Sequence, residues 1–134
     1  MDIKLELVIL PVSDVDKARD FYVQAGFNLD HDQTVSEEVR FVQLTPPGSA
    51  CSIAFGKGLT TMEPGTVRGL QAVVADAAAV REDLLGRGIE VSDVADLAWG
   101  SFVYFTDPDG NAWALQQLPS WTRGAGGTGQ RPDA

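Results

Sequence analysis

The sequence has few of the residues that build metal and disulfide sites. Its 134 residues include one cysteine, Cys51, and one histidine, His31. A single cysteine excludes an intrachain disulfide and any metal site made of several cysteines. No apolar stretch is long enough to span a bilayer, and the first residues lack the layout of a signal peptide. We therefore expect a cytoplasmic protein.

Positive charge is also scarce. Ten Lys and Arg residues stand against nineteen Asp and Glu residues, which gives a formal net charge of −9. Such a surface repels phosphate backbones and anionic lipids, so we expect neither nucleic acid nor membrane as a partner, whereas a cationic ligand is attracted. The 44% of apolar and 22% of charged residues are typical of one globular domain.

The sequence contains an internal repeat. A shift of 62 residues aligns it with itself without a gap, and the matches fall mainly on residues that begin and end elements. The matched pairs include Asp14 with Asp76, Gly26 with Gly88, Pro46 with Pro108, and Gly48 with Gly110. We predict two homologous half-modules, at about residues 3–60 and 66–118, that make up a single domain over residues 1–118.

Each half carries the same order of local signals. In the first half, an apolar run from Leu5 to Val12 predicts a buried strand. Asp14 and Gly26 then bracket a helix, as its N-cap and its closing glycine. The second half repeats this order from the run Leu70 to Val74 onward.

A hairpin closes each half, and its turn contains proline followed by glycine. Proline fixes φ early in a turn and glycine accepts positive φ later, so both turns are predicted to be tight. The predicted hairpin strands are Phe41 to Leu44 and Ala50 to Phe55 in the first half, and Phe102 to Phe105 and Asn111 to Gln116 in the second. The fold class is therefore α+β: two tandem βαβββ modules that form a curved, mostly antiparallel sheet around a cleft, with the helices outside.

The last residues differ in composition from the rest. Residues 119–134 are rich in glycine and have little to bury. We expect a disordered tail, in which Trp121 is a candidate to fold back as an anchor.

Two stretches of the sequence resemble the vicinal oxygen chelate superfamily, which includes glyoxalases, extradiol dioxygenases, fosfomycin-resistance enzymes and bleomycin-resistance proteins. The opening stretch is Leu10 to Ala18 with Phe21-Tyr22 and Gly26-Phe27, and the closing stretch is Phe105 to Asn111 with Trp113 and Leu115. The likeness extends to Leu118 and implies the paired βαβββ fold. Because this scaffold hosts both metal enzymes and plain binding proteins, the fold alone does not decide the function.

The resemblance also implies four positions at which enzymes of this family hold a divalent metal. Here those positions are occupied by Leu7, Ser52, Gly69 and Ala114. Three of these side chains have no ligand atom, and one neutral hydroxyl cannot hold a metal alone. A slip of one residue would bring Glu6 or Gln71 toward the site but would turn the apolar side of the strand into the cavity. We therefore expect no metal and no cofactor, as in the metal-free bleomycin-resistance branch.

Without a metal, the concave sheet face becomes a cleft for a ligand. Residues two apart share one face of a strand, which predicts a ligand-binding set of Leu7, Ile9, Ser52, Ala54, Gly69, Gln71, Trp99, Phe102, Tyr104, Ala114 and Gln116. The repeat adds Arg40 and Val42 to this face. Small residues on this face are equally consistent with a ligand pocket and with close packing of another layer. Trp99 is equally consistent with a surface on which a flat ligand stacks and with an ordinary packing anchor. We expect His31 in a solvated loop.

Three functions compete. The favoured one is a binding protein, without catalytic residues, for a small aromatic or cationic antibiotic or natural product. For it the resemblance implies a homodimer, often with exchanged halves. The second is a metal-independent isomerase, cyclase or lyase that uses polar groups such as Tyr104, Gln71 and Ser52 for proton transfer. The third, a metal-dependent glyoxalase or dioxygenase, predicts stoichiometric metal in the purified protein.

Overall fold

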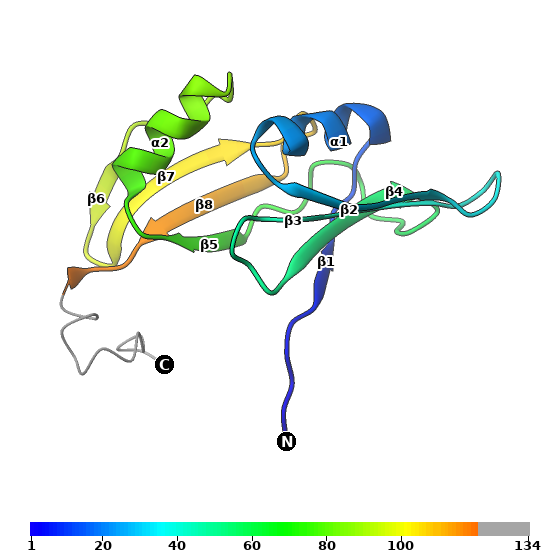
Figure 1. Ribbon diagram of the computed structural model, residues 1–134, viewed down its shortest axis with the longest axis horizontal. Helices are drawn as coiled ribbons and strands as arrows, with labels where there is room; N and C mark the ends of the chain where they lie inside the picture. Colours follow the sequence, from blue (N-terminus) through cyan, green and yellow to red (C-terminus); the bar gives the residue numbers. More distant parts are fainter. Residues whose placement is uncertain (121–134) are drawn as a thin grey trace. The chain divides into compact units, whose positions relative to one another are not determined.

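The computed structural model describes residues 1–120 (Figure 1). The elements of the first half are β1 (Leu7–Ile9), α1 (Val15–Gln24), β2 (Asn28–Thr34), β3 (Arg40–Thr45) and β4 (Ser52–Lys57). Those of the second half are β5 (Leu70–Val74), α2 (Ala77–Gly86), β6 (Ala95–Leu97), β7 (Gly100–Thr106) and β8 (Ala112–Gln117). This order confirms the α+β fold of two βαβββ modules. Most of the predicted tail, including Trp121, lies outside the described residues.

The described residues form two compact units, named here the first unit and the second unit. The first unit comprises Met1–Arg68 and Thr106–Ala112, and the second comprises Gly69–Phe105 and the described residues from Trp113 onward. The turn between β7 and β8 therefore belongs to the first unit. The single domain and the single cleft stay predictions.

The first unit contains a four-stranded sheet in the order β1-β4-β3-β2, with β1 parallel to β4 and the other pairs antiparallel. One face of this sheet is covered by α1 (Figure 1). The side chain of Asp14 accepts a hydrogen bond from the Lys17 amide at 3.1 Å, and Gly26 follows the helix with φ of 102°. Both predicted helix boundaries are confirmed. Tyr22 of α1 is fully buried, and its ring packs against that of Phe55 with a centroid distance of 5.8 Å.

The second unit contains a four-stranded sheet in the order β5-β8-β7-β6, with β5 parallel to β8 and β6 antiparallel to β7. Asp76 caps the start of α2 by accepting from the Ala79 amide at 3.1 Å, as predicted. Gln117 of β8 accepts from the Ala77 amide of α2 at 2.9 Å, so alternation along β8 places Trp113 on the helix side of the sheet. There its ring stacks with that of Phe105 at 5.8 Å, and both rings are buried. Neither α1 nor α2 is long and apolar enough to cross a membrane.

A buried polar lock fixes the turn between β7 and β8 within the first unit. Asp107 is 3% exposed, and its Oδ1 accepts from three backbone N–H groups of the turn at 2.9–3.0 Å. Its Oδ2 accepts from the Tyr22 hydroxyl at 2.9 Å and from Asn111 Nδ2 at 2.8 Å, and the same Asn111 nitrogen donates to the carbonyl of Pro11 at 2.9 Å. Residues that carry the family resemblance thus stabilise the first unit.

The first strand is shorter than predicted. The sequence predicts a strand from Leu5 to Val12, but only Leu7–Ile9 form β1. A strand needs a paired neighbour, and β4 begins at Ser52, directly opposite Leu7. Beyond β1, Pro11 has no N–H group to donate to a ladder.

The prediction that Arg40 and Val42 face the cleft is wrong. Val42 lies opposite Phe55, whose ring contacts α1, and Arg40 forms an ion pair with Asp16 of α1 at 2.8 Å. The cause is a difference between the hairpins. Leu44 pairs with Ile53 in the first, whereas in the second the amide of Asp107 donates to the carbonyl of Asn111. After the 62-residue shift, these two strand pairings differ by an odd number of residues. An odd offset exchanges the two faces of a strand.

Candidate functional site

The open face of the second unit, defined as the side of its sheet turned away from α2, gathers most of the predicted ligand-binding residues of that unit. Gln71 lies opposite Ala114, and Gln116 follows two residues later on the same face. Because Phe105 stacks on the helix side, alternation turns Phe102 and Tyr104 to the open face. Gly69 precedes β5 and is exposed. A Cβ added at Gly69 would meet nothing within 4 Å.

Aromatic side chains are exposed on this open face and at its margin. The rings of Phe102 and Tyr104 stack with a centroid distance of 6.0 Å and an interplanar angle of 5°. Phe102 is buried, but Tyr104 is 40% exposed. Trp99, in the turn between β6 and β7, is 59% exposed. The second unit therefore offers flat, solvent-accessible ring surface.

Two glutamines and a backbone carbonyl form a hydrogen-bonded chain beside these rings. Gln71 Nε2 donates to Gln116 Oε1 at 2.7 Å, and Gln116 Nε2 donates to the carbonyl of Trp99 at 2.7 Å. Gly100 has φ of 132°, and a Cβ there would stand 2.1 Å from the Gln117 carbonyl oxygen, so only glycine lets the turn approach β8. Sequence reasoning found the two glutamines but not the chain, because its acceptor is a backbone atom.

The open face of the first unit, the side of its sheet turned away from α1, holds the other four predicted residues. Leu7 pairs with Ser52 and Ile9 with Ala54, so the four share this face. Leu7 and Ile9 are half-buried, Ser52 is 5% exposed, and Ala54 is fully buried. This group is therefore much less accessible than the aromatic surface of the second unit.

A polar chain that the sequence did not predict ends at Ser52. The hydroxyl oxygens of Ser52 and Thr45 are 2.6 Å apart, and the Thr45 hydroxyl donates to a carboxylate oxygen of Asp30. This hydrogen bond is the main reason that the pKa of Asp30 lies below its usual value; burial opposes the shift and Asn28 reinforces it. The carboxylate therefore stays charged and acts as a hydrogen-bond acceptor.

A β-bulge in β2 brings Asp30 to that position. The register between β2 and β3 shifts between Leu29 and His31, which leaves Asp30 as the extra residue. After the bulge, Asp32 pairs with Val42 and points to α1. His31 is exposed, as expected, but it lies in β2 and not in a loop. No signal in the sequence marks the bulge.

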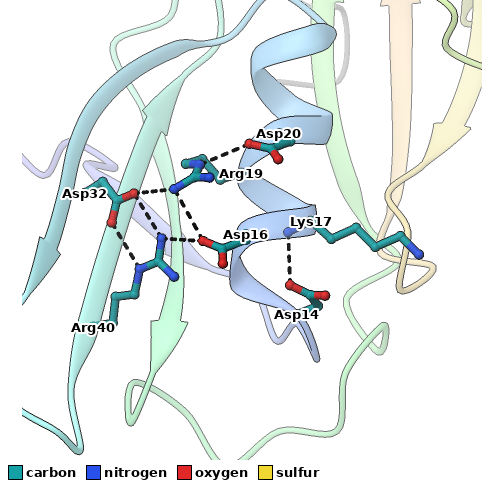
Figure 2. A network of polar contacts seen from close by, with 7 residues as sticks. All are labelled: Asp14, Asp16, Lys17, Arg19, Asp20, Asp32 and Arg40. Carbon is teal, nitrogen blue, oxygen red and sulfur yellow. Dashed lines mark hydrogen bonds and ion pairs between the residues drawn. The ribbon is translucent and has the colours of Figure 1, made fainter.

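On the helix side of the first unit, an ion-pair network joins α1 to the sheet (Figure 2). Arg40 binds both carboxylate oxygens of Asp32 at 3.0–3.1 Å and reaches Asp16 of α1 at 2.8 Å. Arg19 donates to Asp32 at 2.8 Å. The hydrogen bonds from Arg40, then those from Arg19, hold the pKa of Asp32 below its usual value, and they raise the pKa of Arg40 in return. This network is structural.

A cavity of about 580 Å³ lies over α1, and its lining includes Asp14, Asp16, Asp20 and Lys17. Its carboxylates are already engaged: Asp14 caps the helix, and Asp16 and Asp20 contact arginine side chains. The cavity lies on the helix side and contains none of the predicted ligand-binding residues. The open face of the second unit is the better candidate for a ligand site.

Comparison with known proteins places the fold in a family. A sequence model of the Glyoxalase/Bleomycin resistance protein/Dioxygenase superfamily matches residues 4–115. The chain belongs to this superfamily. The match covers both units, and the glyoxalase superfamily is the one to which the sequence motifs pointed.

Two solved structures and one further protein are similar to this chain over most of its length. The crystal structure of TnmS3, an antibiotic binding protein from Streptomyces sp. CB03234, is 38% identical, covers 89% of this chain and 99% of its own, and superposes with a TM-score of 0.78. A superfamily member from Sphaerobacter thermophilus DSM 20745 is 30% identical, with coverages of 86% and 97% and a TM-score of 0.74. The uncharacterized protein YetH of Bacillus subtilis (strain 168) is 26% identical, and the match covers 82% of this chain and 94% of YetH.

The residues at the metal positions implied for glyoxalase-superfamily enzymes do not fit a divalent cation. Leu7, Gly69 and Ala114 carry no ligand atom, and the Ser52 hydroxyl is hydrogen-bonded to Thr45. Among residues 1–120, no group of three or more His, Cys, Asp or Glu residues is arranged to hold a metal ion.

Proposed function

We propose that this glyoxalase-superfamily protein is a metal-free binding protein for a small organic ligand of aromatic character, such as an antibiotic or another natural product. The observation that carries the proposal is the exposed ring surface of Trp99 and Tyr104 on the second unit. Aromatic side chains gain most by covering apolar ligand surface, and nearby amides such as that of Gln71 supply orientation. The other predicted residues of both open faces belong to the proposed binding set.

The relatives and the charge support this proposal. TnmS3, which is 38% identical and covers 89% of this chain, is an antibiotic binding protein. The net charge of −9 favours a ligand that carries a positive group in addition to its ring.

The polar groups of the open faces favour binding over catalysis. A general base works best when its pKa lies near the working pH. The pKa of Asp30 is instead lowered by its hydrogen bond from Thr45, and the amides of Gln71 and Gln116 do not titrate. Loss of turnover in Tyr104→Phe, with ligand binding retained, would favour a metal-independent enzyme instead.

The proposal is tested by titrating a panel of antibiotics while tryptophan fluorescence is recorded. We expect at least one compound to change the emission, because Trp99 is exposed on the proposed surface. The Trp99→Phe variant should lose most of that change, whereas Trp113→Phe should keep it, since Trp113 is buried on the helix side. A flat response across a broad panel would contradict the proposal.

The metal-free state has a separate test. Elemental analysis of protein purified without chelators should find zinc, manganese, iron and magnesium well below one ion per chain. Stoichiometric metal that survives dialysis would contradict this part of the proposal.

We also propose that the protein works as a homodimer in the cytoplasm. The side chains of Met1, Ile3 and Leu5 are exposed, and they alternate with charged residues in the segment that leads into the edge strand β1. A second copy would cover such an apolar row. Sedimentation should give twice the chain mass, and Leu5→Asp should shift the protein toward the monomer. A concentration-independent monomer would contradict the dimer.

A further inference from the structure

We infer that Gln116 is a positioning residue that holds Gln71 with its amide oxygen directed to the ligand, and that the ligand therefore carries a hydrogen-bond donor at the edge of its ring. The inference rests on the proposed function and specifies the chemistry of its ligand. It follows from the direction of one hydrogen-bonded chain and from the burial of its members.

The direction of the chain is fixed at one end by a backbone atom. The carbonyl of Trp99 can only accept, so Gln116 must turn its Nε2 toward it, and the two atoms are 2.7 Å apart. The Oε1 of Gln116 then faces Gln71 and can only accept from it. Gln71 must therefore use its Nε2 for the 2.7 Å contact, which leaves its Oε1 outside the chain. Neither amide can flip without placing two acceptors or two donors against each other.

Burial separates the roles of the two glutamines. Gln116 is 6% exposed, and both ends of its amide are engaged within the chain, so contact with a ligand would break a buried hydrogen bond. Gln71 is exposed on β5, and its Oε1 has two lone pairs to offer. Gln71 therefore contacts the ligand, and Gln116 sets the orientation of that contact.

The surroundings of Gln71 define the class of ligand. The ring stack of Phe102 and Tyr104 shares the open face with Gln71, and the exposed Trp99 supplies the carbonyl that anchors the chain. A flat ring system would cover the aromatic surface, and a hydroxyl, amino or ring N–H group at its edge would donate to Gln71 Oε1. A ring whose edge bears only acceptors would leave that oxygen without a partner, which weakens binding.

The test uses two probes that differ in one hydrogen-bond donor, 2-naphthol and 2-methoxynaphthalene. Their dissociation constants are measured by NMR titration of the wild-type protein and its variants. We expect the wild type to bind 2-naphthol about tenfold more tightly, which corresponds to one hydrogen bond of about 1.4 kcal/mol. In Gln71→Met the ratio should fall to about one through weaker binding of 2-naphthol, whereas 2-methoxynaphthalene should bind as before.

The variant Gln116→Met tests the positioning role, because methionine keeps the length of the side chain but makes neither hydrogen bond. With Gln71 free to rotate, we expect the preference to shrink to about threefold or less while ring binding persists, as estimated from the loss of most of one hydrogen bond. The side-chain amide signals of Gln71 should also move toward the positions of a solvated amide. Gln33→Met, on β2 of the first unit, is the matched control and should keep the wild-type ratio.

The outcomes separate the inference from the proposed function. If both probes bind the open face and Gln71→Met keeps the wild-type preference, the inference is wrong and the binding function stands. If Gln116→Met lowers both affinities equally without changing their ratio, Gln116 is structural and the positioning role is wrong. If neither probe shifts any signal of the second unit at its solubility limit, the proposed function fails and the inference fails with it.

Discussion

The two units repeat the same order of elements but differ in how much aromatic surface they expose. In the first unit, Tyr22 and Phe55 are fully buried between α1 and the sheet. In the second unit, Tyr104 and Trp99 are exposed at or beside the open face. Aromatic surface that is left in water gives folding no burial free energy, so its presence on one unit favours a role in binding. We therefore propose that the second unit carries most of the ligand surface and that the role of the first unit is mainly structural.

The helices differ in the same sense. In the first unit, Asp16 of α1 is paired with Arg40 of β3, and Arg19 with Asp32 of β2. In the second unit, Arg81 of α2 donates to the carbonyl of Ser92 at 3.0 Å in the segment that follows the helix. Ion pairs thus tie the first helix to strands, whereas the second helix contacts a strand through a hydrogen bond from the Ala77 amide to Gln117 Oε1 at 2.9 Å.

The largest effect should come from removing the polar lock of the first unit. Asp107→Ala leaves the Tyr22 hydroxyl, the Asn111 amide and three backbone N–H groups with fewer acceptors in a buried site. We expect the free energy of unfolding to fall by about 3 kcal/mol or more. Urea denaturation measures the change. Asp109→Ala, which removes only the contacts with Ser13, should cost about 1 kcal/mol. If the two substitutions lowered the free energy of unfolding equally, the stabilising role of the buried polar lock would be contradicted.

Two glycines provide the next largest contrast. Gly65 has φ of 79°, and a Cβ there would stand 2.0 Å from the Asp109 carbonyl oxygen. Gly65→Ala should therefore lower the free energy of unfolding by about 2 kcal/mol or more. At Gly69 an added Cβ meets nothing within 4 Å, so Gly69→Ala should change stability by at most about 0.5 kcal/mol. Thermal unfolding distinguishes the two, and equal destabilisation would show that Gly69 is as constrained as Gly65.

The tyrosines of the two units should separate stability from binding. Tyr104→Ala should weaken the binding of an aromatic ligand about tenfold. It should change the free energy of unfolding little, because Tyr104 is 40% exposed. Tyr22→Phe should lower the free energy of unfolding by about 1 kcal/mol and leave the affinity unchanged, because it keeps the ring and removes the buried hydrogen bond that the hydroxyl donates to Asp107. Calorimetric titration and denaturation check the pair. The reverse pattern would contradict the division of roles between the units.

The smallest effect concerns acid stability. The hydrogen bonds from Arg40 and Arg19 lower the pKa of Asp32 in the folded protein below the value of about 3.9 in an unfolded chain. The stabilisation is therefore present above about pH 4 and is lost as the pH falls through the folded pKa. Asp32→Asn should cost about 0.5–1 kcal/mol at neutral pH, and this difference should vanish in strong acid.

A control for the acid-stability prediction lies in the second unit. Asp93 also pairs with an arginine, but its side chain is 97% exposed. Asp93→Asn should give no measurable change in stability at any pH. If Asp93→Asn lowered the free energy of unfolding as much as Asp32→Asn, the ion-pair network of α1 would contribute no more than an exposed ion pair.

Much of the fold could be predicted from local signals. Asp14 and Asp76 as helix caps, and Gly26 and Gly88 as helix ends, are each recognisable from a few neighbouring residues, and the structure confirms them. The face of β3 could not be predicted, because it depends on a register between strands that the 62-residue repeat does not preserve. The repeat therefore predicts the wrong face for Arg40.

The candidate site was predictable only in part. Alternation along strands was enough to place Gln71, Ala114 and Gln116 on one face. The bulge that turns Asp30 toward Thr45 depends on strand pairing, and the anchor of the glutamine chain is the backbone carbonyl of Trp99. Neither feature has a sequence signal, because both arise from tertiary contacts. That these residues contact a ligand stays a prediction.

The most direct test of the account is an NMR titration of the isotope-labelled protein with 2-naphthol. The account predicts that the signals that shift most belong to the second unit, at Gln71, Trp99 and Tyr104, and that those of α1 stay in place. Shifts centred instead on Asp16 and Asp20 of α1, with Tyr104 unaffected, would contradict the claim that the open face of the second unit is the ligand surface.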